Sequence, residues 1–373
     1  MKEEYTSLGL MSGTSGDGVD ASIIQSDGNA KYKVIKDKYF KYEDEIQQNI
    51  HNLKDKIHGS SDLKKFIKEL SHLERQITLF HAKVIKNISE HNDLDIIGFH
   101  GQTIYHNPQE KISNQLGDGR LLSQLVKKDI VYNFRQNDIK NGGEGAPLAP
   151  IFHQLVATQN ELSLPICILN IGGISNITIV NEPTGSFGFT SRDIGPGNCL
   201  IDSWVRKNSK KNYDKDGILA ARGVKNDIIF EQAQELFSNR LNQNTLSFDV
   251  NDFDVSFVRG LSLEDGATTL TDFTARIIGA ALSSISSKSS SKFKKVLVCG
   301  GGRKNKILIE KIKKNIFKNI SIQPIDDYKV DGDFIESQAF AFLAIRSILN
   351  LPITFPNSTG CKKPSTGGEI IKY

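Results

Sequence analysis

The sequence contains little cysteine, and its cysteines are not spaced to bind a metal or to form a set of disulfides. The four in 373 residues are Cys167, Cys199, Cys299 and Cys361, with no CxxC pair among them. Cys167 and Cys299 lie in apolar runs, where a thiol packs as a small hydrophobic side chain. The spacing predicts reduced thiols in a cytoplasmic protein and excludes a zinc site or a disulfide framework.

A long apolar segment and a strong excess of one charge are also missing. No uninterrupted apolar run approaches the roughly 20 residues of a membrane-spanning helix, and residues 1–5 lead directly into a strand-like run instead of a signal peptide. The 47 Lys and Arg against 43 Asp and Glu give a net charge of +4. The lysines are scattered, as in residues 304–318, without a basic stripe interleaved with aromatics. We therefore expect neither a membrane nor a nucleic acid as partner.

The common nucleotide-binding and metal-binding motifs are absent. The sequence has no GxxxxGK[ST] and no GxGxxG, so P-loop and Rossmann interpretations lack their usual support. It has no HExxH or HxxxH either. What it does contain is three turns rich in small residues, at 12–18, 172–175 and 300–302.

Strand and helix patterns alternate along the chain, which favours an α/β fold. Strands are expected at residues 5–11, 19–25, 32–40, 94–99, 130–134, 166–171, 176–180, 294–299 and 320–324. Helices are expected at residues 62–92, 121–128, 150–159, 198–207, 226–237, 268–286, 304–319 and 335–349. A chain of 373 residues is too long for one ordinary domain and suits two.

A unit of strand, glycine turn and strand occurs near the start of each half, at Leu8 to Ile24 and at Ile168 to Val180. The repetition predicts two similar lobes with a cleft between them. We expect the first lobe at residues 1–160 and the second at 161–373, and the last helix is also able to pack back on the first lobe.

The first turn has the composition of a phosphate cradle. Residues 13–18 offer successive backbone N–H groups on a flexible chain, together with hydroxyls, and Asp17 or Asp20 could hold Mg²⁺ through water. An ordinary hairpin explains this turn alone equally well, because Asp-Gly is a common hairpin signal. Gly172 and Gly173 with Ser175 offer a second cradle, and residues 300–302, between a strand and a helix, offer a third.

Several longer stretches carry a resemblance to a known family. The matching stretches, in chain order, are GLMSGTSGDGVD at 9–20, HGQTI at 100–104 with His106 and Pro108, GGEGAPL at 142–148, NIGGISN at 170–176, DIGPGN at 193–198, CGGG at 299–302 with Asn305, and Glu336 ahead of Ala339-Phe340-Ala341. Together this ordered set resembles the anhydro-N-acetylmuramic acid kinase family along almost the whole chain.

The resemblance implies two ribonuclease-H-like lobes with an ATP and sugar cleft, as in the actin, heat-shock chaperone and sugar kinase superfamily. It implies hydrolysis of the 1,6-anhydro ring of 1,6-anhydro-N-acetylmuramic acid, phosphorylation of the 6-hydroxyl with ATP and Mg²⁺, a role in recycling the cell wall, and a homodimer. It implies that Asp193 is the general base and that Arg135, His100 and Glu336 bind the sugar. The residues it implies for ATP are Gly13, Thr14, Ser15, Gly16, Asp17, Gly18, Val19, Asp20, Gly172, Gly173, Ser175, Gly300, Gly301, Gly302 and Asn305, with Mg²⁺ near Asp17 and Asp20.

The chemistry of Asp193 can also be argued from the reaction. Opening the anhydro bridge needs water at the anomeric carbon, and a carboxylate there can take the water's proton. The departing oxygen can then attack the γ-phosphate, so the phosphoryl group replaces a general acid and catalysis depends mainly on positioning. The alternative is that Asp193 or Asn198 only satisfies N–H groups before the following helix.

The sequence departs from the family pattern at a few positions. Asn133 stands where an acid is expected, which puts a charge pair with Arg135 in doubt. Glu144 replaces Gln, Ile194 replaces Thr, and Gly16 replaces a larger apolar residue. We expect activity to survive these changes. His100 and His106, flanking a predicted polar loop, are expected to form sugar or structural hydrogen bonds and not to ligate a metal.

Other functions remain open at this point. One is a kinase of an ordinary N-acetylated sugar, which would not incorporate water at the anomeric carbon. Another is a regulatory ATPase of the same fold that switches by lobe closure, with ATP turnover indifferent to muramyl sugars. Carbamoyl transferases of the superfamily are disfavoured because the His pair that they use is missing.

Overall fold

The computed structural model describes residues 2–90, 92–181, 188–241, 248, 253–287 and 292–373. The chain forms two compact units, unit 1 with Met1–Glu161 and Asp333–Tyr373, and unit 2 with Leu162–Gly332. Residues 333–373, expected in the second domain, therefore belong to unit 1. The reason is that helix α11 (Ile335–Ile348) packs against three strands of the unit 1 sheet.

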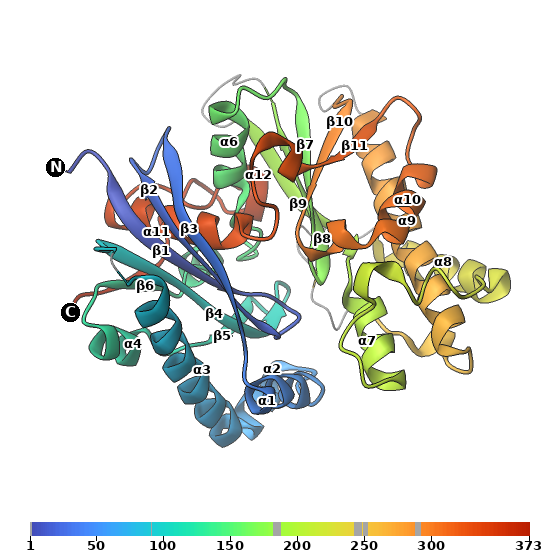
Figure 1. The fold of residues 1–373 in the computed structure, drawn as a ribbon, viewed down its shortest axis with the longest axis horizontal. Helices are drawn as coiled ribbons and strands as arrows, with labels where there is room; N and C mark the ends of the chain where they lie inside the picture. The colour runs from blue at the N-terminus through green and yellow to red at the C-terminus, as the bar shows by residue number, and fades with distance from the viewer. Residues whose placement is uncertain (1, 91, 182–187, 242–247, 249–252, 288–291) are drawn as a thin grey trace. The chain divides into compact units, whose positions relative to one another are not determined.

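The unit 1 sheet has the order β12-β6-β4-β1-β2-β3, with β5 paired to β4 (Figure 1). The strands are β1 (Tyr5–Ser12), β2 (Gly18–Ser26), β3 (Tyr32–Lys41), β4 (Ile96–Asn107), β5 (Ile112–Leu116), β6 (Ile130–Tyr132) and β12 (Glu369–Ile371). Strands β1, β2 and β3 are antiparallel neighbours, whereas β1, β4 and β6 run parallel. Parallel strands end at the same edge, which places the β1–β2 turn beside the middle of β4.

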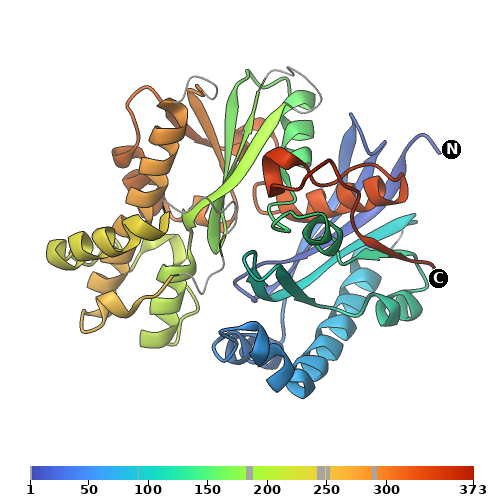
Figure 2. The same ribbon diagram turned by 180° about the vertical axis from the view of Figure 1, so that it is seen from behind.

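Helices cover both faces of this sheet (Figures 1 and 2). The helices of unit 1 are α1 (Asp44–Lys54), α2 (Ser60–Lys65), α3 (Ile67–Ile88), α4 (Gly119–Val126), α5 (Gln136–Lys140), α6 (Pro150–Gln159), α11 and α12 (Pro356–Thr359). Leu8 and Leu10 of β1 pack with α1 and α3, whereas Met11 packs in the cluster that includes α11. A Cβ on Gly9 or Gly98 would overlap backbone oxygens of α11, so these glycines allow the helix to lie close to the sheet.

Unit 2 is built around a second sheet with the order β11-β10-β7-β8-β9. Its strands are β7 (Ile166–Ile171), β8 (Ile174–Val180), β9 (Phe189–Pro196), β10 (Lys295–Cys299) and β11 (Ser321–Pro324), and its helices are α7 (Cys199–Asn208), α8 (Asp227–Leu241), α9 (Leu263–Ser287) and α10 (Lys306–Asn315). Apolar side chains of α9 and α10 pack against the strands, and a second cluster joins α7, α8 and α9.

The two sheets share one topology. In each, three antiparallel strands follow one another, and two later strands extend the sheet parallel to the first strand. Strands β1, β2, β3, β4 and β6 of unit 1 thus correspond to β7, β8, β9, β10 and β11 of unit 2. This order is that of the ribonuclease H fold, so the predicted pair of similar α/β lobes is confirmed.

Some expected elements differ from the structure. Residues 100–106 were expected to be a polar loop, but they continue β4, because β5 supplies an antiparallel partner for the polar stretch. The helix expected at 62–92 is broken at Phe66 (φ −102°, ψ 23°) into α2 and α3. Helix α1 and strand β9 were not expected, and β9 places Asp193 in a strand and not at a helix end.

Candidate active site

The turn between β1 and β2 is held by side chains that contact its carbonyl oxygens. The pairs are Gln102 Nε2 with Gly13 O (3.0 Å), Lys54 Nζ with Thr14 O (2.8 Å), Tyr39 Oη with Asp17 O (3.0 Å) and Ser12 Oγ with Gly18 O (2.9 Å). The amide of Gly16, which has a φ of +61°, also donates to Gly13 O at 3.1 Å. Since the C=O and N–H of a peptide unit point in opposite directions, the Thr14 and Ser15 amides face away from these side chains.

Beneath the turn lies a buried polar cluster. Ser12 Oγ is 2.8 Å from both Tyr42 Oη and Gln102 Oε1, and Ser12 and Gln102 are almost fully buried. Burial, the largest cause, raises the pKa of Tyr42 far above its usual value, so this hydroxyl stays protonated and able to donate. Such a satisfied buried network makes a turn rigid. These supports of the turn could not be recognised from the sequence, because Tyr39, Tyr42 and Lys54 are distant from it along the chain.

The two carboxylates proposed for Mg²⁺ lie at the turn and early in β2. Asp17 Oδ1 accepts a hydrogen bond from Ser15 Oγ at 2.6 Å, and Asp20 is opposite Met11 of β1. Both side chains are partly accessible. In the described part of the chain no cluster of three or more His, Cys, Asp and Glu could hold a metal alone. These two carboxylates still fit Mg²⁺, which commonly keeps several waters and binds one or two carboxylates together with substrate phosphates.

The second turn, Gly172-Gly173, is closed by the chain that follows β9. The amides of Gly197 and Asn198 donate to Gly173 O and Gly172 O, both at 2.8 Å. A Cβ on Gly197 would overlap Gly172 O, so this close approach requires glycine. Ser175, a predicted ATP ligand, is fully buried, and its Oγ donates to Pro196 O at 3.1 Å.

The third glycine segment follows β10 and packs on the end of β7. Gly300 has a φ of +77°, and its amide donates to Gly332 O at 2.8 Å. A Cβ on Gly300 would overlap Asn170 Oδ1, and one on Gly302 would overlap the Ile171 side chain. Because β7 and β10 are parallel neighbours, with Asn170 opposite Cys299, this segment and the Gly172 turn leave the same edge of the sheet. Ligands of open α/β sheets bind at this kind of edge.

Three of the predicted ATP-binding glycines lie where a larger residue would also fit. Gly13 and Gly172 have only ordinary contacts where a Cβ would lie, and Gly301 has nothing within 4 Å. None of the three has a positive φ. Gly59, the residue before α2, has the same freedom. One glycine of each predicted phosphate turn is therefore not required by the fold.

Arg303, which the sequence analysis did not single out, anchors the third segment. Its guanidinium makes two hydrogen bonds to Asp326, at 2.8 and 2.9 Å, and one to Gly300 O at 3.1 Å. The hydrogen bond from Arg303, its largest cause, lowers the pKa of Asp326. Asn305, a predicted ATP ligand, caps α10 by accepting from the amide of Leu308 at 3.0 Å.

Asp193, the predicted base, is a buried residue of β9. It is 6% exposed and lies opposite Asn176 of β8. Its Oδ2 accepts a hydrogen bond from the amide of Phe248 at 2.7 Å. A buried carboxylate with a backbone donor on one oxygen is held in a defined orientation, as a general base requires. The suggested role of Asp193 at the start of a helix is wrong, because α7 begins only at Cys199.

Arg135 and His100 are brought together in unit 1. Arg135 donates from Nη2 to His100 Nε2 at 3.0 Å and from Nη1 to Gly145 O at 3.1 Å. Because a guanidinium only donates, His100 Nε2 carries no proton, and Nδ1–H donates to Gly101 O at 2.8 Å. Burial, then the charge of Arg135, lowers the pKa of His100 to about 3, so the ring is neutral near pH 7.

Unit 1 also contains Glu336, His106 and two positions that differ from the family pattern. Glu336 lies in the first turn of α11, partly exposed. Asn133 takes a φ of +53°, which asparagine tolerates, and its side-chain amide donates to Glu369 at 3.1 Å. The amide of Glu144 donates to Thr359 O at 2.8 Å. His106 Nδ1 lies 3.0 Å from Ser113 Oγ, so the expected structural hydrogen bond is present.

Because four buried histidines of unit 1 have lowered pKa values, we expect the protein to lose stability in acid. Burial, the largest cause in each, lowers the pKa of His81 and His153 to about 4 and of His100 and His106 to about 3. The unfolded chain takes up these protons near pH 6.5, so the stabilisation is complete above that pH and is lost as pH falls toward 3–4. We expect a clearly lower thermal midpoint at pH 5 than at pH 7, by calorimetry. Equal midpoints at pH 5, 7 and 8 would contradict it.

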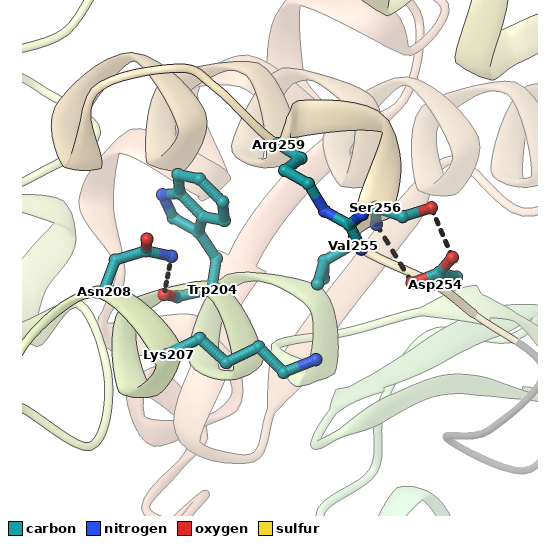
Figure 3. A pocket seen from close by; sticks show the side chains of 7 residues that line it. All are labelled: Trp204, Lys207, Asn208, Asp254, Val255, Ser256 and Arg259. Atoms are coloured by element: carbon teal, nitrogen blue, oxygen red, sulfur yellow. Dashed lines mark hydrogen bonds between the residues drawn. The ribbon is translucent and has the colours of Figure 1, made fainter.

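The helical part of unit 2 contains a surface pocket (Figure 3). It is lined by Trp204, Lys207, Asn208, Asp254, Val255, Ser256 and Arg259. Asn208 donates to Trp204 O at 2.9 Å, and Ser256 contacts Asp254 through both its amide and its hydroxyl. No predicted ATP, sugar or metal residue lines this pocket.

Comparison with known proteins identifies the family. The family model described as anhydro-N-acetylmuramic acid kinase matches residues 5–373. The chain belongs to the anhydro-N-acetylmuramic acid kinase family. It is 57% identical to the anhydro-N-acetylmuramic acid kinase of Pelagibacter ubique (strain HTCC1062), covering 100% of both chains. It is 37% identical to that of Zymomonas mobilis, covering 97% of this chain and 98% of the relative.

Membership of this kinase family makes the chain an enzyme that transfers a phosphoryl group.

Among solved structures, component A of (R)-2-hydroxyglutaryl-CoA dehydratase from Acidaminococcus fermentans is 14% identical, with a TM-score of 0.43, covering 92% of this chain and 99% of that one. Within the described residues, no helix is both long and apolar enough to cross a membrane.

Proposed function

We propose that this kinase uses ATP and water to convert 1,6-anhydro-N-acetylmuramic acid into N-acetylmuramic acid 6-phosphate, a step in recycling the bacterial cell wall. Water opens the bridge between C1 and O6, and O6 takes the γ-phosphoryl group. One water oxygen becomes the new hydroxyl at C1, and one proton is released. Family membership supports the sugar, and the geometry of the residues supports the chemistry.

The observation that carries the ATP part is the open space over Gly13, Gly172 and Gly301. Because neither backbone conformation nor packing requires glycine there, a bound group that approaches the backbone closely explains all three. The Thr14 and Ser15 amides supply oriented donors for phosphate oxygens. Asn170 Oδ1 is buried and lacks a hydrogen-bond partner among the described residues. This atom also supports a ligand site at the edge of the unit 2 sheet where the Gly172 and Gly301 turns lie.

Asp193 is the proposed general base. Its orientation is fixed by the amide of Phe248, and it accepts a proton from the water that attacks C1. The oxygen that leaves C1 is captured by phosphorus, so no acid has to protonate it. The chain's task is therefore to hold sugar, water and phosphate in line. Mg²⁺, held by Asp17 and Asp20 through water, supplies neutralisation of phosphate charge when it is bound.

Arg135 is proposed to bind the sugar, together with His100 and Glu336. The substrate carries a lactyl carboxylate, and arginine is suited to pair with carboxylates. His100 is a neutral acceptor for Arg135, so it orients the guanidinium without cancelling its charge. We infer that this pair selects acidic muramyl sugars.

The test is product analysis with ATP and Mg²⁺. Incubation with 1,6-anhydro-N-acetylmuramic acid is expected to give ADP and a sugar 6-phosphate, identified by ³¹P NMR and mass spectrometry. N-acetylmuramic acid and N-acetylglucosamine are the matched comparisons. Faster phosphorylation of either open sugar would favour an ordinary N-acetyl-sugar kinase, and ADP formation indifferent to all three sugars would favour a regulatory ATPase.

A further inference from the structure

Lys54 reaches the first glycine turn from the C-terminal end of α1. Its side chain is half-buried, and Nζ donates to Thr14 O at 2.8 Å. A lysine in the last turn of a helix is favoured by the helix dipole. That preference explains a positive charge at the end of α1, but not a hydrogen bond to a carbonyl 40 residues earlier in the chain.

The contact fixes a specific peptide unit. The carbonyl of Thr14 and the amide of Ser15 belong to one planar unit and point in opposite directions. Gln102 holds the preceding unit in the same way, through Gly13 O at 3.0 Å. In the described part of the chain, no group accepts a hydrogen bond from the Thr14 or Ser15 amide. Lys54 and Gln102 therefore keep two donors directed at whatever lies over the turn.

We propose that Lys54 is a positioning residue for ATP: it fixes the Thr14–Ser15 peptide so that the Ser15 amide meets a phosphate oxygen. The inference rests on the proposed function, since it takes ATP as the group bound at this turn. The positive charge of Lys54 acts in the same direction, because it raises the potential where phosphate oxygens lie. Lys54 is not a catalytic residue, because its contact is with the turn.

The test compares Lys54→Met with Lys54→Arg and with Lys56→Met, a change at an exposed lysine two residues away. Loss of one charge-assisted hydrogen bond predicts a KM and a Kd for ATP about tenfold higher in Lys54→Met. The KM for the sugar and the thermal midpoint should stay near wild type. Lys54→Arg should recover most of the affinity, and Lys56→Met should match wild type.

Calorimetric titration of ATP without sugar separates this inference from the proposed function. If wild type binds ATP and phosphorylates the sugar, but Lys54→Met has an unchanged Kd for ATP, the role of Lys54 is wrong and the proposed function stands. Equal changes in both KM values together with a lower thermal midpoint would reduce Lys54 to a structural contact and overturn the inference. Failure of wild type to bind ATP would overturn both.

Discussion

Replacement of Asp193 with asparagine is expected to lower kcat on the order of 10²–10⁴-fold, because it removes the group that takes the proton of the attacking water. Asparagine has nearly the same shape, and its side-chain oxygen can still accept from the amide of Phe248, now 2.7 Å from Asp193 Oδ2. The thermal midpoint should therefore change little. Steady-state assays of ADP and sugar phosphate measure the rate.

The matched control for this variant is Asp227→Asn. Asp227 is also in unit 2, but its side chain is 72% exposed and, among the described residues, forms an ion pair with the partly exposed Lys225, at 2.7 Å. Exposed ion pairs contribute little, so activity and stability should remain near wild type. Wild-type kcat in Asp193→Asn would show that another group accepts the proton.

Replacement of Gly301 with alanine is expected to raise the KM for ATP by about tenfold or more without loss of stability, because the new Cβ occupies space proposed for the nucleotide. Gly301 is exposed, with no atom within 4 Å of an added Cβ. Its φ is not positive, so alanine is not strained there. Denaturant unfolding and ATP titration of the same samples give the two quantities.

Gly302→Ala is the contrasting variant in the same segment. Its Cβ would overlap Ile171, so it should cost about 1–3 kcal/mol of the free energy of unfolding, as overpacked sites do. We expect Gly302→Ala to lose stability and Gly301→Ala to keep its stability but bind ATP more weakly. This contrast would distinguish a glycine required for packing from a glycine that contacts the ligand. An unchanged KM for ATP in Gly301→Ala would contradict the proposal that ATP binds over Gly301.

Much of the fold was predictable because its signals are local. The β1–β2 and β7–β8 hairpins are apolar strands joined by glycine turns, and such turns are recognisable from adjacent residues alone. Helix α1 was missed although Ile46, Ile50 and Leu53 are buried at helical spacing, so a signal was there to find. Strand β9 has no strong strand pattern in the sequence and depends on its pairing with β8.

The composition of the candidate site was predictable, but its supports were not. Glycine turns and Asp193 lie in short motifs, whereas Lys54, Tyr39 and Arg303 act through contacts made only in the folded chain. Two predicted ATP ligands, Ser175 and Asn305, also make local hydrogen bonds, through a hydroxyl and an amide oxygen that the motifs alone do not reveal. A motif shows which residues are present, and only the tertiary structure shows what each of their atoms already contacts.

In the proposed mechanism, hydrolysis of the anhydro ring and phosphoryl transfer are coupled through Asp193. The most direct measurement is brief incubation with ATP, Mg²⁺ and 1,6-anhydro-N-acetylmuramic acid in ¹⁸O-labelled water, followed by mass spectrometry. Unlabelled N-acetylmuramic acid 6-phosphate in the same water controls for exchange at C1. We predict a sugar 6-phosphate with one ¹⁸O at C1, formed by wild type and not by Asp193→Asn. A product without label, or an equal amount of labelled product from Asp193→Asn, would contradict coupling through Asp193.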